Sequence, residues 1–191
     1  MTARTHDLFA FAFLVTAAVA FTPRTISVPT IFTSVVGNVV GALIPDMDQA
    51  SNRLWDLLPG GNAVGKIFRH LFLGHRTISH SFIGGLLLYK LLLFVLPRLL
   101  NSSYVDIHIV LISIMLGFVS HLFADALTKE GIPLFFPFKL KIGIPPIKLL
   151  RVVTDSWVEH IIVLPLVLVY IAYIFINHQY IFINMFKSVA S

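Results

Sequence analysis

Five apolar stretches, each near the length of a membrane-spanning helix, limit what this chain of 191 residues can fold into. They lie at residues 7–22, 27–45, 81–97, 104–124 and 160–180. Because the hydrocarbon core of a bilayer is about 30 Å thick, a helix needs about 20 mostly apolar residues to cross it. Only 12% of the residues are charged, against about a quarter in soluble proteins. The sequence predicts an all-α integral membrane helical bundle of about five transmembrane helices, in a single domain over residues 1–191.

Two of these stretches carry further local signals. LFAFAFLV at residues 8–15, preceded by Arg4 and followed by AVA at residues 18–20, also fits a cleavable signal peptide. The second stretch contains Gly37 and Gly41, a GxxxG spacing that lets helix backbones approach closely. We therefore expect this second helix to pack tightly against a neighbour.

Positive charge is divided unevenly between the two ends of the predicted helices. The start of the chain and the two long loops, residues 46–80 and 125–159, hold ten of the 14 Lys and Arg residues. The positive-inside rule places both loops in the cytoplasm, within a multi-pass protein of the inner or plasma membrane. The net charge of +5 predicts membrane lipids as partners. The sequence shows no basic soluble domain for binding nucleic acid, and it leaves the oligomeric state open.

Histidines and carboxylates gather on this same predicted side. The candidates are His6, Asp46, Asp48, His75, His80, His121, Asp125 and Glu159. Among them, His121 and Asp125 are four residues apart and so face the same way on a helix. The acids and histidines of the opposite side are Asp106, His108 and His178. Because the chain has no cysteine, a metal would be held by His, Asp, Glu or water.

Each candidate also has an ordinary structural interpretation. Asp46 and Asp48 fit helix caps, Glu159 fits a capping box with Ser156, and His6 fits an interfacial residue. The His–Asp pair of the fourth stretch fits a hydrogen bond within the membrane. Independent caps would not leave the opposite side almost free of acids and histidines. The joint pattern therefore favours a site for one or two divalent ions, zinc first, with manganese or iron next.

The spacing within HRTISHS, residues 75–81, constrains the local backbone. His75 and His80 are five residues apart, which is roughly 140° around an ideal helix. They cannot both point inward from one regular helix. We expect His75 and Arg76 to lie in a loop and the helix to begin near Ser79, with His80 in its first turn.

The segment from residue 126 to residue 150 contains four prolines and two glycines, which argue against a continuous helix. Its phenylalanines at 135, 136 and 138 are followed by lysines at 139, 141 and 148. This combination suits a loop in the lipid headgroup region, with the aromatic rings toward the hydrocarbon and the lysines toward anionic lipid. Two interpretations remain for this loop. It borders the entry of a substrate, or it only anchors the chain to the membrane.

The order of the motifs resembles the YdjM family of predicted membrane-bound metal-dependent hydrolases. The resemblance is carried by His6, by PDMDQ at residues 45–49, by HRTISHS, and by SHLFADALTKEGIPLFFP at residues 120–137. Gln49 departs from the pattern, since many relatives have His there. More distantly, the ligand order is similar to zinc-dependent phospholipase C and the P1-type nucleases, which are all-helical enzymes that cleave phosphodiesters.

The resemblance implies a hydrolase that cleaves a phosphoester or another ester, in a lipid or a phosphodiester substrate, with metal-activated water. The first metal site would use His121 together with one of Asp46 and Asp48 and one of His75 and His80. Asp125 would bridge two ions, and His6 with Glu159 would complete the second site. Arg76 would stabilise charge on a phosphoryl group, or it is a plain positive charge on that side.

A second hypothesis is a non-catalytic metal-binding membrane protein, either a carrier or a scaffold. A carrier needs polar residues along its spans, yet residues 81–97 and 160–180 are almost purely apolar, with Lys90 the one charge in the middle of the former. Lipid phosphatases with a histidine nucleophile also carry HxxxD in a membrane helix. They require arginines near their histidines, and residues 104–124 contain none.

Overall fold

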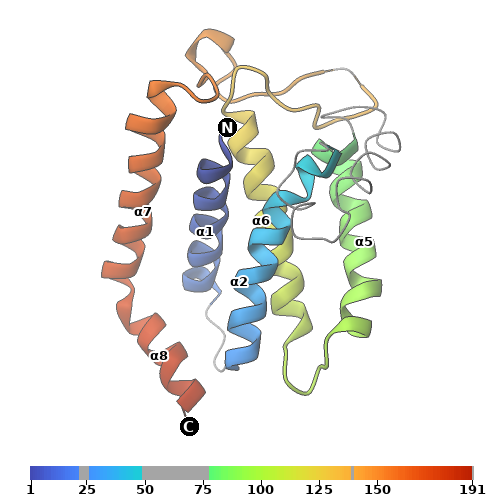
Figure 1. The fold of residues 1–191 in the computed structure, drawn as a ribbon, viewed down its shortest axis with the longest axis vertical. Coiled ribbons are helices and arrows are strands. Elements are labelled where there is room, and N and C mark those ends of the chain that lie inside the picture. The colour runs from blue at the N-terminus through green and yellow to red at the C-terminus, as the bar shows by residue number, and fades with distance from the viewer. Residues whose placement is uncertain (22–25, 49–77, 139, 191) are drawn as a thin grey trace, which may run out of the picture.

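The computed structural model describes residues 1–21, 26–48, 78–138 and 140–190, with the backbone alone for Asp48 and residues 186–190. Within these ranges the regular secondary structure is helical, with no β-strand. Figure 1 shows the long helices standing side by side in one bundle. The predicted all-α class is confirmed.

The long helices follow the predicted apolar stretches closely. They are α1 (Ala3–Ala20), α2 (Val28–Leu43), α5 (Phe82–Leu99), α6 (Ile107–Ala126), α7 (Leu164–Asn177) and α8 (Gln179–Ala190). Short helices are the 3-10 turns η1 (Pro45–Asp48), η2 (Ile78–His80) and η3 (Lys148–Leu150), and the π-helical η4 (Glu159–Val163), which continues into α7. Four helices, counting η4 with α7, are long and apolar enough to cross a membrane, and α2 is a shorter apolar helix. The helical membrane bundle is thereby confirmed, and α8 lies beyond the predicted stretches.

Polar side chains decide where three of these helices begin. Ser27, Ser81 and Asp106 are the N-caps of α2, α5 and α6, and each accepts hydrogen bonds from backbone N–H groups of the first turn. These donors have no partner within the helix and need such a cap. Because the Ser81 hydroxyl accepts from the Gly84 N–H at 3.2 Å, α5 begins after it. His80 therefore lies in η2, before α5, and not in the first turn of the long helix as expected.

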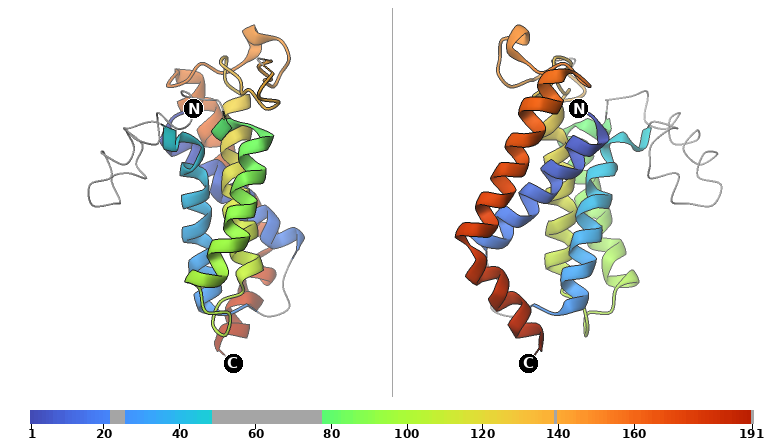
Figure 2. Two further views of the ribbon diagram at one scale, coloured as in Figure 1. Left: turned by 90° about the vertical axis from the view of Figure 1, so that its right-hand side faces the viewer. Right: turned by 60° about the vertical axis from the view of Figure 1, so that its left-hand side comes forward.

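The central helix of the bundle is α6. Of an 18-residue stretch of α6, 56% is buried, compared with 33% or less for α1, α5 and α7. Figures 1 and 2 show α6 (yellow) behind and between α1, α2 and α5. Side chains that α6 carries at its C-terminal end are therefore surrounded by other helices.

Glycines let α2 and α6 approach each other closely. A Cβ on Gly41 would collide with the backbone carbonyl of Ile114, and one on Gly117 would collide with that of Asn38. The Asn38 side chain donates from Nδ2 to the carbonyl of Ser113 at 3.1 Å. The close packing predicted from the GxxxG spacing is present, with α6 as the partner.

The helix ends that carry candidate site residues meet at one end of the bundle. The start of α1 lies beside the C-terminal end of α6, and η1 and η2 lie at the same end, while α8 lies at the other (Figures 1 and 2). This arrangement follows from the alternating direction of successive spanning helices. It brings residues from distant parts of the sequence into one layer.

Residues 127–158, called the cap below, run over this end between α6 and η4 (Figure 1). Ile132 and Ile142 exchange N–H···O bonds of 2.8 Å in both directions, and the Val152 N–H donates to the carbonyl of Leu127 at 3.0 Å. As the prolines predict, the described part of the cap contains no continuous helix. It is nevertheless a folded element, because its own backbone pairs.

The glycine contact predicts that Gly41→Ala destabilises the bundle, by about 1–3 kcal/mol as for other overpacked sites. The added methyl group meets a backbone carbonyl, so α2 and α6 must separate. The thermal unfolding midpoint in detergent measures this effect.

Gly37→Ala is the matched control on the same helix. Its Cβ would meet a side-chain atom of Ile114 at 2.9 Å and no backbone atom, so we expect a smaller loss of stability. A Gly37→Ala variant that loses as much stability as Gly41→Ala would contradict the backbone contact as the cause.

Candidate metal centre

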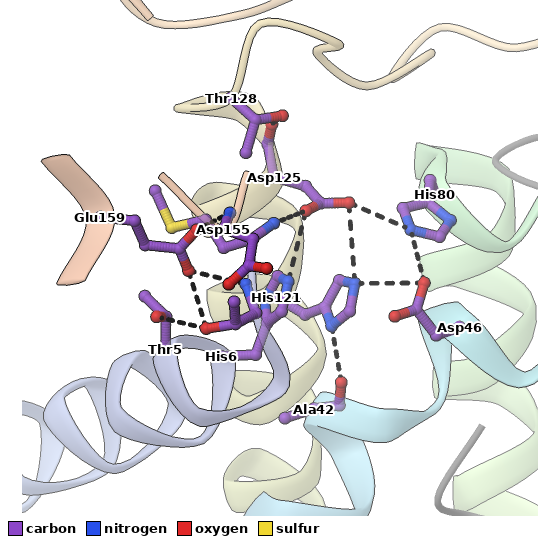
Figure 3. A network of polar contacts seen from close by, with 12 residues as sticks. Thr5, His6, Ala42, Asp46, His80, His121, Asp125, Thr128, Asp155 and Glu159 are labelled. Atoms are coloured by element: carbon purple, nitrogen blue, oxygen red, sulfur yellow. Dashed lines mark hydrogen bonds and ion pairs between the residues drawn. The ribbon is translucent and has the colours of Figure 1, made fainter. Parts of the chain in front are cut away.

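Five side chains from four elements converge where the helix ends meet. They are His6 of α1, Asp46 of η1, His80 of η2, and His121 and Asp125 of α6, called the His/Asp cluster below (Figure 3). The carboxylate of Asp125 lies at the centre. Its Oδ1 is 3.3 Å from His6 Nε2, and its Oδ2 is 3.6 Å from His80 Nε2 and 3.9 Å from His121 Nε2. Residues separated by more than 100 positions in sequence thus share one carboxylate.

The second carboxylate of the cluster is Asp46, which faces two of the same imidazoles. Its Oδ1 is 3.6 Å from His80 Nε2 and 3.7 Å from His121 Nε2 (Figure 3). The 3-10 turn η1 directly follows α2, and the tight α2–α6 contact carries it to this position. Asp46 therefore closes the cluster on the side opposite His6.

Two sets of three groups within the cluster have the spacing of metal ligands. One set is His6, His121 and Asp125, and the other is Asp46, His80 and His121. In each set, one donor atom per residue lies within 4.8 Å of the others. Two imidazoles with one carboxylate suit zinc, manganese or iron. His121 is common to both sets.

The hydrogen bond on the far side of His121 fixes which nitrogen faces the cluster. His121 Nδ1 lies 2.7 Å from the carbonyl of Ala42, and a carbonyl can only accept, so Nδ1 carries the proton. Nε2 then presents its lone pair to the cluster, where it is buried without a hydrogen bond in the described residues. A backbone carbonyl behind an imidazole is the usual way to orient a metal-ligating histidine. The donor set therefore fits a divalent metal ion.

Ring packing holds the imidazoles in place. The rings of His6 and His121 stack with their centroids 3.9 Å apart and their planes 8° apart. On the other side, His80 meets His121 edge to face at 5.4 Å, and Ser79 Oγ lies 3.0 Å from His80 Nδ1. These contacts leave the Nε2 atoms as the ones that face the carboxylates.

The cluster is buried except at Asp46. The exposed fractions of the side chains are 0% for His80, 1% for Asp125, 2% for His121 and 7% for His6, compared with 29% for Asp46. Among its described members, the cluster is therefore most exposed at Asp46.

Charge pairing outweighs burial for the two members that lie outside the spanning helices. Burial raises the pKa of the Asp46 carboxyl, but His80 and His121 lower it more, so this pKa lies well below its ordinary value. Burial lowers the pKa of His80, but the carboxylates of Asp125 and Asp46 raise it above its ordinary value. Both shifts favour a charged His80–Asp46 pair.

Glu159 is buried at the same end but lies in neither donor set. Its Oε1 accepts from the N–H of Thr2 at 2.6 Å and from the hydroxyl of Thr2 at 2.9 Å. Its Oε2 accepts from the N–H of Asp155 at 2.8 Å. Ser156 Oγ accepts from the Glu159 N–H at 3.4 Å, as the capping box predicts. The carboxylate itself anchors the first turn of α1, four residues before His6.

Two contacts of Asp125 were not predicted from the sequence. The amino group of Met1 donates to its Oδ1 at 3.0 Å, with both groups buried. The Thr128 hydroxyl donates to the backbone carbonyl of Asp125 at 2.7 Å. The threonine could have been found as the third residue after the aspartate in SHLFADALT, whereas no sequence signal marks an amino group.

Three of the predicted site residues are not placed. They are His75 and Arg76, which lie outside the described residues, and Asp48, whose side chain lies outside them. Gln49, the departure from the family pattern, is also outside the described residues. Their predicted roles as ligands and as a stabiliser of phosphoryl charge stay predictions. The same holds for the expected position of His75 and Arg76 in a loop.

Comparison with known proteins matches the chain to a family. The family model described as YdjM inner membrane protein covers residues 1–184. The chain belongs to this family. Uncharacterized protein YvsG of Bacillus subtilis (strain 168) is 33% identical over 129 residues, which make up 68% of this chain and 70% of YvsG. Inner membrane protein YdjM of Escherichia coli (strain K12) is 28% identical over 145 residues, or 76% of this chain and 70% of that protein. No solved structure matches.

His121 lies in both donor sets of this YdjM-family protein, so we predict that His121→Ala removes bound metal. Both donor sets need His121 Nε2, so neither can form without it. We expect about one to two equivalents of a divalent transition metal in the purified wild-type chain. Elemental analysis by mass spectrometry should find that most of it is lost in the variant.

His108→Ala is the control from the same helix. This imidazole is exposed at the other end of α6, and its loss should leave the metal content unchanged. Circular dichroism should show equal helix content in both variants. Equal metal content in the two proteins would rule out the cluster as the metal site.

The position of Glu159 predicts a milder defect for Glu159→Gln. An amide cannot accept from Thr2 and Asp155 as a carboxylate does, so the first turn of α1 loosens and His6 is less well held. Metal affinity should fall about 10- to 100-fold, as for other groups that orient ligands. A titration with Co²⁺, followed by its visible spectrum, measures this.

Asp155→Asn is the matched control, because only the backbone N–H of Asp155 reaches Glu159. It should bind Co²⁺ like the wild type. Complete loss of metal in Glu159→Gln would instead favour the ligand role that the family resemblance implies.

Proposed function

We propose that this protein is a membrane-bound metal-dependent hydrolase that cleaves a phosphoester or another ester at the membrane face. One observation carries the proposal: three imidazoles and two carboxylates from four elements converge on one point, and Asp46 is the most exposed of them at 29%. Buried ionisable groups at the end of spanning helices are costly, and they are typical of functional sites. We propose zinc as the first candidate and manganese as the second.

The chain's own residues would hold and orient the ion. His6, His80 and His121 offer Nε2 atoms, and the two oxygens of Asp125 face different imidazoles. A divalent ion held there lowers the pKa of bound water and neutralises charge on an ester or phosphoryl oxygen. The side chain of His121 is shielded from bulk water at 2% exposure, whereas Asp46 is 29% exposed.

Arg76 is proposed to stabilise negative charge on a phosphoryl group. A guanidinium matches two such oxygens at once. Its place in sequence, between His75 and η2, supports the assignment, since η2 carries His80.

The cluster is proposed to face the cytoplasm. The support is the charge asymmetry, since ten of 14 Lys and Arg residues belong to the same side as the cluster. Positively charged loops are retained on the cytoplasmic side.

A second candidate function is metal binding without catalysis. The observation that favours it is burial, because four of the five side chains of the cluster are at most 7% exposed. Structural metal sites are closed, whereas catalytic sites keep an open position. Within this candidate a scaffold is favoured over a carrier, because the described surfaces of α5 and α7 are predominantly apolar.

Turnover by the metal-loaded protein separates the two candidates. We expect the purified chain, in mixed micelles, to hydrolyse at least one member of a panel of phospholipids, phosphatidic acid, isoprenyl phosphates and bis-p-nitrophenyl phosphate. Release of phosphate or alcohol should stop after chelation and return with zinc or manganese. His80→Ala should lower the rate at least about 100-fold, as expected when a metal ligand is lost.

His160→Ala is the control on the same membrane face. This half-exposed histidine pairs with Asp155 and lies in neither donor set, so its loss should leave the rate unchanged. Tight metal binding without turnover of any substrate in the panel would favour the non-catalytic candidate.

A further inference from the structure

The cap exposes large apolar side chains whose contact with water would be energetically unfavourable. Leu149 is 85% exposed, Phe138 73% and Leu150 67%. Leu140 and Ile147 are exposed to a similar degree. Soluble surfaces rarely gather this much apolar area in one place, and where they do, it marks an interaction site.

Between Glu130 and Asp155, the charged residues of the cap are all basic. Residues 131–154 contain four basic residues and no acid. Of these, Lys141 and Lys148 are exposed among the apolar side chains. Apolar groups combined with lysines, without carboxylates, complement a bilayer surface that contains anionic lipid.

The position of the cap places it at such a surface. It begins where α6 ends and finishes where η4 and α7 begin, and both helices are long and apolar enough to cross a membrane. The described connection at the other end, residues 100–106, differs, because Tyr104 is its one exposed large apolar side chain. The described part of the connection after α1, also at the other end, exposes one more such side chain, Phe21. In the described parts of these connections, more large apolar side chains are therefore exposed at the end of the His/Asp cluster than at the other end.

The backbone of the cap, which presents these side chains, packs against helices that lie next to the His/Asp cluster. Ile132 is 3% exposed and packs with Phe118 and Leu122 of α6. The carbonyl of Leu134 accepts from the N–H of Phe82 at 3.0 Å, two residues after His80. The surface is thus preformed, and its frame contacts α6, which carries His121 and Asp125, and the start of α5, two residues after His80.

We propose that the cap is a docking surface for anionic phospholipid, whose headgroups contact Lys141 and Lys148 while the apolar side chains around them enter the acyl region. The lipid phosphates then lie at the same end of the bundle as the His/Asp cluster. This docking does not depend on metal or on hydrolysis, so it stands or falls separately from the proposed function.

Selective quenching of a single tryptophan tests the proposal in vesicles of phosphatidylglycerol and phosphatidylcholine. The full chain carries Trp55→Phe, Trp157→Phe and Leu149→Trp, so that one tryptophan reports on the cap. Bromine is placed on the acyl chains of only one of the two lipids at a time. We expect about half of the emission or more to be quenched, and more by brominated phosphatidylglycerol than by the same fraction of brominated phosphatidylcholine.

Charge variants measure the contribution of the lysines. In the reporter background, Lys141→Gln and Lys148→Gln should each lower the preference for phosphatidylglycerol by up to about fivefold. Arg98→Gln removes one positive charge at the opposite end of α5 and should leave the preference unchanged. Trp157, itself 66% exposed, is a second reporter in a Trp55→Phe chain if the Leu149→Trp protein does not fold.

Three results would overturn the proposal. Quenching by aqueous acrylamide and by neither brominated lipid would place the cap in water. Protection from acrylamide and from both lipids would mean that protein covers it. Equal quenching by the two brominated lipids would remove the preference for anionic headgroups.

Discussion

The arrangement of the metal-centre end depends on one buried carboxylate, that of Asp125. A charge at the end of an apolar spanning helix costs several kcal/mol unless opposite charges or donors compensate it. Asp125 is 1% exposed, and its compensation comes from the amino group of Met1 and from His6 and His80. These partners belong to two separate segments of the chain, the N-terminal residues through α1 and the turn η2. The need to satisfy this group therefore draws α1 and η2 onto the end of α6.

The close contact of α2 and α6 makes that convergence geometrically possible. Only glycine fits at Gly41 and Gly117, where each Cα faces a backbone carbonyl of the other helix. At this separation the carbonyl of Ala42 reaches His121 Nδ1, and η1 carries Asp46 to the far side of the same ring. The contact between α2 and α6 thus both packs the two helices and orients His121 as a candidate ligand.

Local patterns were enough to predict several members of the candidate site. The i, i+4 spacing of His121 and Asp125 places both on one side of α6. The motifs left a choice between Asp46 and Asp48 and between His75 and His80. The fate of Glu159 was harder to predict, since its carboxylate binds Thr2, 157 residues away in sequence. The beginning of α5 was misjudged by about one turn, because a serine cap and a 3-10 turn compete for the same residues.

The sequence by itself determined that the chain forms apolar helices of membrane length, that its polar candidates fall at one end of them, and that it belongs with the YdjM family. These properties follow from composition, from spacing along single helices and from short motifs, all of which are local. Only the tertiary structure decided which candidate residues come together in the His/Asp cluster. Burial of Asp125 selects His6 and His80 as its neighbours, while the open first turn of α1 attracts Glu159. Competition among buried polar groups for partners depends on distances between helices, and no local pattern contains those distances.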